Sequence, residues 1–584
     1  MTRSAADSAT AVQPAERPAP NQALRALLAE TEWTQEAFAR ALGRLGAESG
    51  VRLSYDRTSV ARWLRGSRPA PHVQRFLAEA LSRRLGRPVT VDQLGMGDGT
   101  SGGPGRRARR TPRGTTAFRE GADAELAGGA GARTADAGDR LALCADRLAA
   151  LTAPVVGPPR ADAPAPVPYR LALLGPAEPS PEHATADGTP PPGGARHPDT
   201  EDSPYGPNPP APAGTSPDTP SAPRAPSAPD ATPPPAPHGP RPPRAPFPTI
   251  RRGGRPTRRT TPGEVASVRE HVRFFAAQTD RHGGGHIEAP LAACLAELVR
   301  RLRSGGDGPH HAQLLAGAAR LGYLLARVYA DEQRHGLAQR AFLTAADLAR
   351  EGGDPDGVAL ARRALGSQAH QLGHLRHSLA LAESACQAAG GGTAAEGTGP
   401  SARSFLYSGL AVARAACGER TAALDALRRA EHELARAPVD LTTGPDSPDG
   451  EPVGAYQDAA LLYQTSRVRV ALGDRDGAIR ELRASLRLRP SGERRTRAIS
   501  HAELAELLLA RGRLDEACAS WQVFLDDCAL IRSGRARRAR DRLPRLLRPY
   551  AHEDCVQALS ARTGLALAAP PGRRPRARPG GRGR

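Results

Sequence analysis

From Val265 onward the chain carries a pattern of small residues and turns that few folds can satisfy. Strand-like alternation is hard to find in this half, where alanine, leucine and arginine dominate. Glycine stands where two helical stretches meet, for example at Gly473 before Ala478, so that the chain can reverse direction there. This half therefore predicts an all-α fold built from antiparallel helix pairs.

Five units of this kind follow one another along the chain. Each places a small residue in the second helical stretch, and these residues are Ala338, Ser378, Ala423, Ala478 and Ala517. Successive small residues are separated by 40, 45, 55 and 39 residues. The unequal spacing indicates that loops of different length join the units, with insertions at 390–400 and 438–452.

These spacings resemble the tetratricopeptide repeat (TPR), whose small residues let two helices approach closely and whose usual period is about 34 residues. The resemblance implies a TPR-like α-solenoid over residues 263–564, with a concave surface that binds a protein or peptide ligand. First helices tend to line such a surface, and the arginines on them are Arg327, Arg414, Arg467 and Arg469. These arginines either clamp the carboxylates of a partner or are ordinary solvated helix residues.

A long stretch without a core precedes the repeats. Residues 97–262 are dense in proline, glycine, serine and arginine, and a chain of this composition cannot bury enough surface to offset its entropy. The composition predicts a disordered linker, within which 140–151 and 169–174 are docking segments or simply more linker. Residues 1–20 are likewise predicted to be a disordered N-terminus, and 565–584 a disordered basic tail.

Near the N-terminus two short helices are predicted to meet at a turn. Thr34 and Asp56 are good N-cap residues for them, and Gly66 ends the second one. Apolar residues recur at helical spacing in both, so each helix is expected to bury one face. The polar residues expected on the open side of the second helix are Arg57, Thr58, Ser59 and Arg62.

The second helix lies in a strongly basic stretch. From Arg52 to Arg87 there are nine arginines and two acidic residues. Arginine can fork onto guanine O6 and N7, hydroxyl groups can reach base edges or phosphates, and a basic patch adds salt-dependent affinity. The pattern predicts a helix that reads the major groove of double-stranded DNA. The alternative is a small helical bundle whose arginines are only solvated.

The run 33–69 resembles the Cro/C1-type (XRE-like) helix-turn-helix, in which a T/S-Q-E segment opens the second helix and a helix ending in R-G-x-R-P reads DNA. The resemblance implies a DNA-binding domain over residues 21–96. It implies that Thr34 and Gln35 position the DNA backbone and that Arg65 and Arg68 lie near phosphates. It assigns base reading to Arg57, Thr58, Ser59 and Arg62. One departure is the turn, because thirteen residues lie between Gly43 and Arg57 where the family has only a few.

Composition argues against several other classes of protein. All 81 basic side chains counted as lysine or arginine are arginine, so there is no Walker lysine and no Schiff-base nucleophile. The seven cysteines form no CxxC pair, which predicts reduced thiols in a cytoplasmic protein. No apolar run is long enough for a membrane span. Two histidine clusters, 282–286 and 370–377, lack further ligands, so neither a metal nor another cofactor is predicted.

The chain is thus predicted to be all-α, with a helix-turn-helix bundle, a disordered linker and a TPR-like solenoid. The two resemblances together imply a cytoplasmic transcriptional regulator and not an enzyme, similar to actinomycete regulators of development and antibiotic production. Partner binding would act through homodimerisation or operator occupancy. The alternative is a TPR interaction scaffold whose helix-turn-helix no longer binds specific DNA. An enzyme built on the repeats would have no site that the sequence can name.

Overall fold

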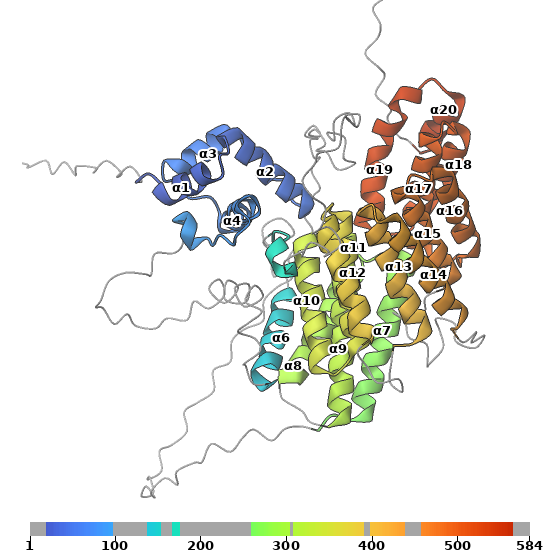
Figure 1. The fold of residues 1–584 in the computed structure, drawn as a ribbon, viewed down its shortest axis with the longest axis horizontal. Coiled ribbons are helices and arrows are strands. Elements are labelled where there is room, and N and C mark those ends of the chain that lie inside the picture. The colour runs from blue at the N-terminus through green and yellow to red at the C-terminus, as the bar shows by residue number, and fades with distance from the viewer. Residues whose placement is uncertain are drawn as a thin grey trace, which may run out of the picture. The chain divides into compact units, whose positions relative to one another are not determined.

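The computed structural model describes residues 19–96, 137–152, 166–175, 259–303, 308–390, 398–437 and 457–563. All regular secondary structure in these residues is helical, which confirms the predicted all-α class (Figure 1). None of the helices formed by these residues is both long and apolar enough to cross a membrane. Of the predicted tails and linker, only residues 19–20, 137–152, 166–175 and 259–262 lie within these ranges.

The N-terminal domain is a small helical bundle with a core of its own. Its helices are α1 (Gln22–Glu30), α2 (Gln35–Glu48), α3 (Arg57–Leu64), α4 (Pro71–Leu85) and the 3-10 helix η1 (Asp92–Leu94). One apolar cluster, running from Leu24 to Met96, includes the fully buried rings of Phe38 and Phe76. Leu94 of η1 and Met96 belong to this core, so the bundle extends at least to residue 96.

Two segments within the predicted linker are ordered and packed. Helix α6 (Ala137–Thr152) buries Cys144 and Leu148 in the same core as the first repeat helices. The 3-10 helix η3 (Leu171–Leu174) follows Tyr169, whose ring is fully buried. Arg170 stands between Tyr169 and η3. Its amide donates to the Gln339 side chain at 2.9 Å, and the Gln339 side chain donates to its carbonyl at 2.7 Å. Both segments are therefore docking segments and not simply more linker, which were the two interpretations of the sequence.

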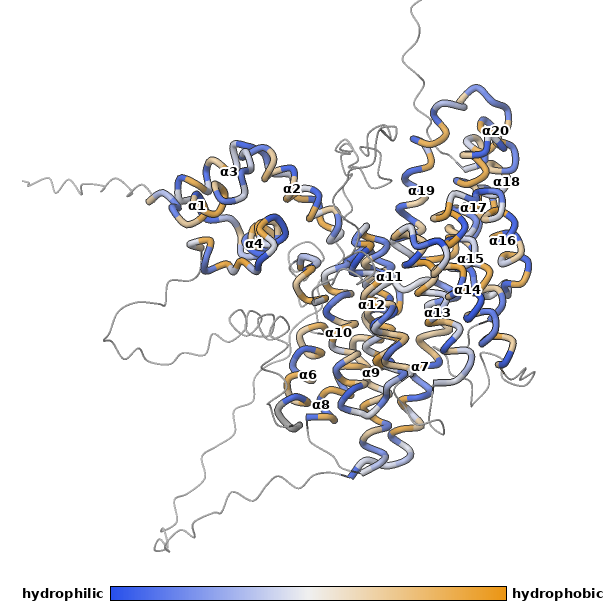
Figure 2. Tube along the Cα trace, viewed as in Figure 1, coloured by the Kyte–Doolittle hydropathy of each residue, from blue (hydrophilic) through white to orange (hydrophobic). Residues whose placement is uncertain are grey.

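The C-terminal half consists of consecutive antiparallel helices. It opens with α7 (Pro262–His282) and α8 (Glu288–Arg303). Five helix pairs follow: α9 (Pro309–Asp331) with α10 (His335–Glu351), α11 (Pro355–Gln371) with α12 (Leu375–Gly390), α13 (Pro400–Ala416) with α14 (Arg420–Ala435), α15 (Asp458–Ala471) with α16 (Arg475–Leu488), and α17 (Arg494–Ala510) with α18 (Leu514–Cys528). The chain then forms α19 (Gly534–Leu547), η5 (Arg548–Tyr550) and α20 (Asp554–Thr563). Hydrophobic residues recur along each helix (Figure 2).

The five pairs share one register, which the small residues define. Ala338, Ala423, Ala478 and Ala517 are 0% exposed and Ser378 is 2% exposed, and each stands in the first turn of the second helix of its pair. Five residues before each of them the backbone has positive φ, at Gln333, Gly373, Gly418, Gly473 and Gly512. Four of these are glycines, which adopt this conformation without steric cost. The reversals predicted from the sequence are therefore confirmed.

The last helices of the solenoid contact the first. The Arg532 amide donates to the His282 carbonyl at 2.7 Å, and the Gly285 amide donates to the Arg532 carbonyl at 3.1 Å. The Arg495 guanidinium lies 2.6 Å from the Asp331 carboxylate, which is 0% exposed. We call this set of contacts the closure of the solenoid. No pattern in the sequence predicts this closure.

Replacing Gly473 by alanine should destabilise the solenoid through the backbone alone. The residue has φ 85°, and nothing lies within 4 Å of the position a Cβ would take, so the side chain itself meets no obstacle. Left-handed backbone costs an L-residue about 1 to 2 kcal/mol. Thermal unfolding of the full chain should show a midpoint lowered by a few degrees.

Gly263 provides the matched control, because it also has open space around it and lies in the first turn of α7 without positive φ. Gly263→Ala should leave the midpoint unchanged or raise it slightly. An unchanged midpoint in Gly473→Ala would contradict the assigned turn.

Candidate functional site

Helix α3 is held in the N-terminal domain by one apolar face. Val60 is fully buried, and the Trp63 ring meets Tyr55 edge to face at 5.1 Å. Leu64 joins the same core. Because these residues occupy the inner face and Ser59 is buried as well, the side chains of this eight-residue helix that are available to a ligand are those of Arg57, Thr58, Ala61 and Arg62.

Both predicted N-caps are confirmed. The Thr34 hydroxyl accepts from the Ala37 amide at 3.1 Å, at the start of α2. The Asp56 carboxylate accepts from the Ser59 amide at 2.9 Å, at the start of α3. This amide, together with two hydroxyl donors, lowers the pKa of Asp56 to about 2. Asp56 is therefore ionised and engaged at the N-terminus of α3.

The hydroxyl groups of α3 do not stand as the sequence analysis expected. Ser59 is only 6% exposed, so the prediction that it faces the open side is wrong. Its hydroxyl donates to Asp56 at 2.8 Å, and so does the hydroxyl of the exposed Thr58. Both groups serve the helix cap, because a serine or threonine after an Asp N-cap can reach back to the carboxylate. Ser59 is unsuited to base reading in this position.

The four arginines predicted to contact DNA are all exposed. Arg62 approaches the Ser59 hydroxyl at 3.5 Å, and the Nε of Arg65 donates to the Ala61 carbonyl at 3.2 Å. Within the described residues no carboxylate pairs with any of them. They are Arg57, Arg62, Arg65 and Arg68.

Some arginines elsewhere in the domain are paired with carboxylates. Arg83 lies 2.6 Å from Glu48 and 2.8 Å from Glu79, and Arg87 lies 2.6 Å from Glu30. Four of the arginines without a carboxylate partner among the described residues therefore lie on and just after α3. Others are spread over the rest of the domain, and they are Arg25, Arg44, Arg52, Arg75 and Arg84.

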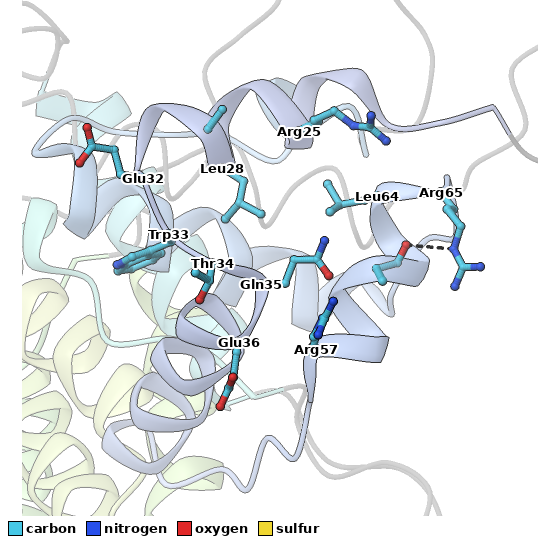
Figure 3. Close-up of a pocket in the computed structure, with 12 residues that line it drawn as sticks. Arg25, Leu28, Glu32, Trp33, Thr34, Gln35, Glu36, Arg57, Leu64 and Arg65 are labelled. Carbon is cyan, nitrogen blue, oxygen red and sulfur yellow. Dashed lines mark hydrogen bonds between the residues drawn. The ribbon is translucent and has the colours of Figure 1, made fainter.

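A depression of about 890 Å³ lies between α1, the start of α2 and α3. Figure 3 shows Gln35 and Arg57 side by side on its wall, with Arg65 farther along α3. Thr34 and Arg25 line it too, and Glu36 lies on the same wall. The structure thus brings together the three residues Thr34, Gln35 and Arg57, which the resemblance assigned to backbone positioning and base reading.

The connection from α2 to α3 differs from the predicted enlarged turn. Helix α2 continues past Gly43 to Glu48, so only residues 49–56 join the two helices. Leu53 packs so closely on Gly46 that a Cβ there would lie 2.7 Å from the Leu53 side chain. Part of the extra length is therefore helix, and the remainder crosses back over it.

A second candidate site is a cavity of about 390 Å³ within the solenoid. Its wall comes mainly from the first helix of each pair, together with α7 and α19. This agrees with the expectation that first helices line the concave surface.

Two of the four arginines predicted to line this surface do so. Arg327 and Arg467 stand at the cavity wall. Arg414 and Arg469 do not: Arg414 pairs with Glu383 at 3.5 Å, and Arg469 pairs with Glu481 at 3.1 Å. For these two, the prediction of a concave position is wrong.

Register explains the difference. Arg327 and Arg467 precede the small residue of their pair by eleven residues, whereas Arg414 and Arg469 precede theirs by nine. Two residues rotate a side chain by about 200° around a helix, because each residue advances about 100°. The position nine residues before thus faces the second helix, and Leu508, 1% exposed, occupies it in the last pair.

The cavity also holds four arginines that the sequence analysis did not single out. They are Arg363, Arg489, Arg495 and Arg535. Three of them come from α17, α19 or the residue that follows α16, and the closure of the solenoid brings these elements to the cavity. The register of the repeats is the one sequence signal that could indicate which residues form the cavity wall. It does not predict that Arg489, Arg495 and Arg535 belong to that wall.

The histidines near the cavity show no metal arrangement. Gly373, with φ 83°, separates His370 in α11 from His377 in α12, as the sequence predicted. Burial, with a smaller contribution from Arg467, lowers the pKa of His370 to about 4. Among the described residues no group of three or more histidine, cysteine, aspartate or glutamate side chains could hold a metal ion.

Comparison with known families covers only the N-terminal domain. A family model described as the SP15 N-terminal domain matches residues 24–97, which span the bundle from α1 to η1. None of the curated proteins matches this chain. The match marks the bundle as a unit that is similar to a known domain family.

Proposed function

We propose that this chain is a DNA-binding transcriptional regulator of the cytoplasm, with a solenoid that binds a partner. The observation that carries the proposal is the row of exposed arginines on and just after α3 of the N-terminal domain. These arginines have no carboxylate partner among the described residues, whereas Arg83 and Arg87 are paired. An uncompensated row of guanidinium groups on an exposed helix suits the phosphates and guanine edges of a major groove.

The geometry supports a division of roles on that face. Arg57 and Arg62 project from α3 itself and are the proposed base readers, with Thr58 beside them. Arg65 and Arg68 stand at and after the end of the helix, where phosphate contact is expected. Gln35 adjoins Arg57 in the depression and is proposed to position the backbone together with Thr34 (Figure 3).

The solenoid is proposed to be TPR-like and to bind a protein, a peptide or another ligand at the cavity lined by Arg327 and Arg467. A single small DNA-binding module offers little interface, so tight operator binding favours a homodimer. The resemblance to actinomycete regulators extends the proposal to development or secondary metabolism.

A second candidate function is an interaction scaffold whose helix bundle packs on protein instead of DNA. The long α2 and the returning connection at Leu53 favour it, because they change the surroundings of α3 relative to a short-turn helix-turn-helix. The exposed unpaired arginines argue against it, since a protein contact would not require them.

Replacing Arg57 and Arg62 together with alanine should abolish sequence-specific binding and preserve helicity. Each bidentate base contact is worth about 1 to 3 kcal/mol, so the double variant should bind its operator at least tenfold more weakly. Chromatin immunoprecipitation of the tagged chain measures the loss of sequence-specific binding. Mobility-shift assays on the enriched motif measure the loss of affinity.

Arg87→Ala is the matched control, because Arg87 is equally basic but paired with Glu30. It should retain the operator peaks. Unchanged protection of the operator by the double variant would show that α3 is not the reading helix. Absence of any motif for the native chain would favour the scaffold.

A fragment of residues 1–96 should bind the same operator more weakly than the full chain. The fragment contains the complete core from Leu24 to Met96 and is expected to fold alone. The fragment lacks the residues that would join two N-terminal domains in a homodimer. It therefore loses the affinity that the dimer gains from the high effective concentration of its second N-terminal domain. A mobility-shift titration of fragment and full chain on one operator tests this, and equal affinity would argue against cooperation between two N-terminal domains.

A further inference from the structure

The cavity of the solenoid has the size of a small-molecule site. Its volume is about 390 Å³, within the range of about 300 to 1,000 Å³ typical of such sites. Arg489, Arg495 and Arg535 line it together with residues of α9 and α11, and Arg495 pairs with Asp331 of α9. A protein segment lying along an open groove would meet these side chains, whereas a compact ligand would fit between them.

The charged groups of the wall favour an anion. Six arginines line the cavity together with three acidic residues. Each acid already has an arginine: Arg327 with Asp280 at 3.4 Å, Arg489 with Glu493 at 2.7 Å, and Arg495 with Asp331 at 2.6 Å. The wall therefore retains an excess of positive charge.

Arg467 is the clearest part of that excess. Arg363 is held by the Phe405 carbonyl at 3.1 Å and the Ser367 hydroxyl at 2.8 Å, and Arg535 approaches Glu503 at 3.7 Å. Arg467 has no hydrogen bond or ion pair with any described residue, although it is half-buried. A half-buried guanidinium gains most from an anion that pairs with it directly.

Aromatic side chains indicate what else the ligand carries. The rings that line the cavity are those of Tyr323, Phe342, Phe405 and Tyr463. A ring on the ligand would fit this aromatic wall.

We infer that this cavity binds a small organic anion that combines a carboxylate or phosphate group with a ring, with Arg467 as the main anion contact. The inference rests on the proposed ligand-binding role of the solenoid and does not depend on DNA binding. It takes the ligand of the solenoid to be a small molecule and not a protein or peptide segment.

The test is isothermal titration calorimetry on the full chain carrying Arg57→Ala and Arg62→Ala, which removes the exposed arginines of α3 as competing anion sites. The probes are AMP, glucose 6-phosphate and 4-hydroxybenzoate. Their neutral counterparts are adenosine, glucose and 4-hydroxybenzyl alcohol, which keep the ring and hydroxyl groups. At least one anion should bind, and its neutral counterpart should bind at least tenfold more weakly.

Variants of one helix provide the controls. Arg467→Gln should reduce the affinity for that anion at least tenfold, and Arg467→Lys should restore part of it. Arg469→Gln, two residues along α15 and outside the cavity, should bind as the parent does. Circular dichroism checks that each variant is folded. Failure of all three anions to bind, equal binding of the neutral counterpart, or full affinity in folded Arg467→Gln would overturn the inference.

Discussion

Close approach of two antiparallel helices at a buried small residue is the constraint on which the C-terminal half depends. The contact is repeated five times, at Ala338, Ser378, Ala423, Ala478 and Ala517, and a positive-φ residue precedes each by five positions. Once that contact is fixed, the rotation of every first helix is fixed as well. The same constraint therefore decides which arginines face the cavity and which lie between the two helices of a pair.

Gln333 shows how firmly the turn geometry is imposed. It occupies the position that glycine holds in the other four reversals, with φ 62°. Its side chain donates to the Ala330 carbonyl at 3.2 Å and accepts from Arg538 of α19 at 3.2 Å. A non-glycine residue is tolerated here because its side chain has specific partners, one of which belongs to the closure region.

The N-terminal domain divides its charged residues between two tasks. Glu30, Glu48 and Glu79 all pair with arginines of α4 or the residues after it, and Asp56 caps α3. With these acids engaged in this way, none of them forms an ion pair with an arginine of α3. Structural and recognition roles thus separate along the sequence, with capping groups before Val60 and exposed arginines on either side of it.

The features that could be predicted from the sequence are those that depend on a local pattern of residues. The caps at Thr34 and Asp56, the small residues of the pairs and the break at Gly373 all follow from neighbouring residues, and the structure confirms them. Ser59 was misplaced because a capping carboxylate competes with the open side for its hydroxyl. The predicted concave position of Arg414 and Arg469 is wrong because the presence of an arginine on a first helix does not show which side of that helix it occupies. The contacts of Arg532 with His282 join residues far apart in the chain, and no local signal encodes them.

The closure has a consequence for how such a protein can change over evolutionary time. An open array of repeats can gain or lose a unit and remain intact, because each unit touches only its neighbours. Here the loss of one pair would carry Arg495 and Arg532 away from Asp331 and His282, and an added pair would do the same in the other direction. The number of units is therefore locked by geometry, and variation is expected to accumulate in the connecting loops instead of in the count.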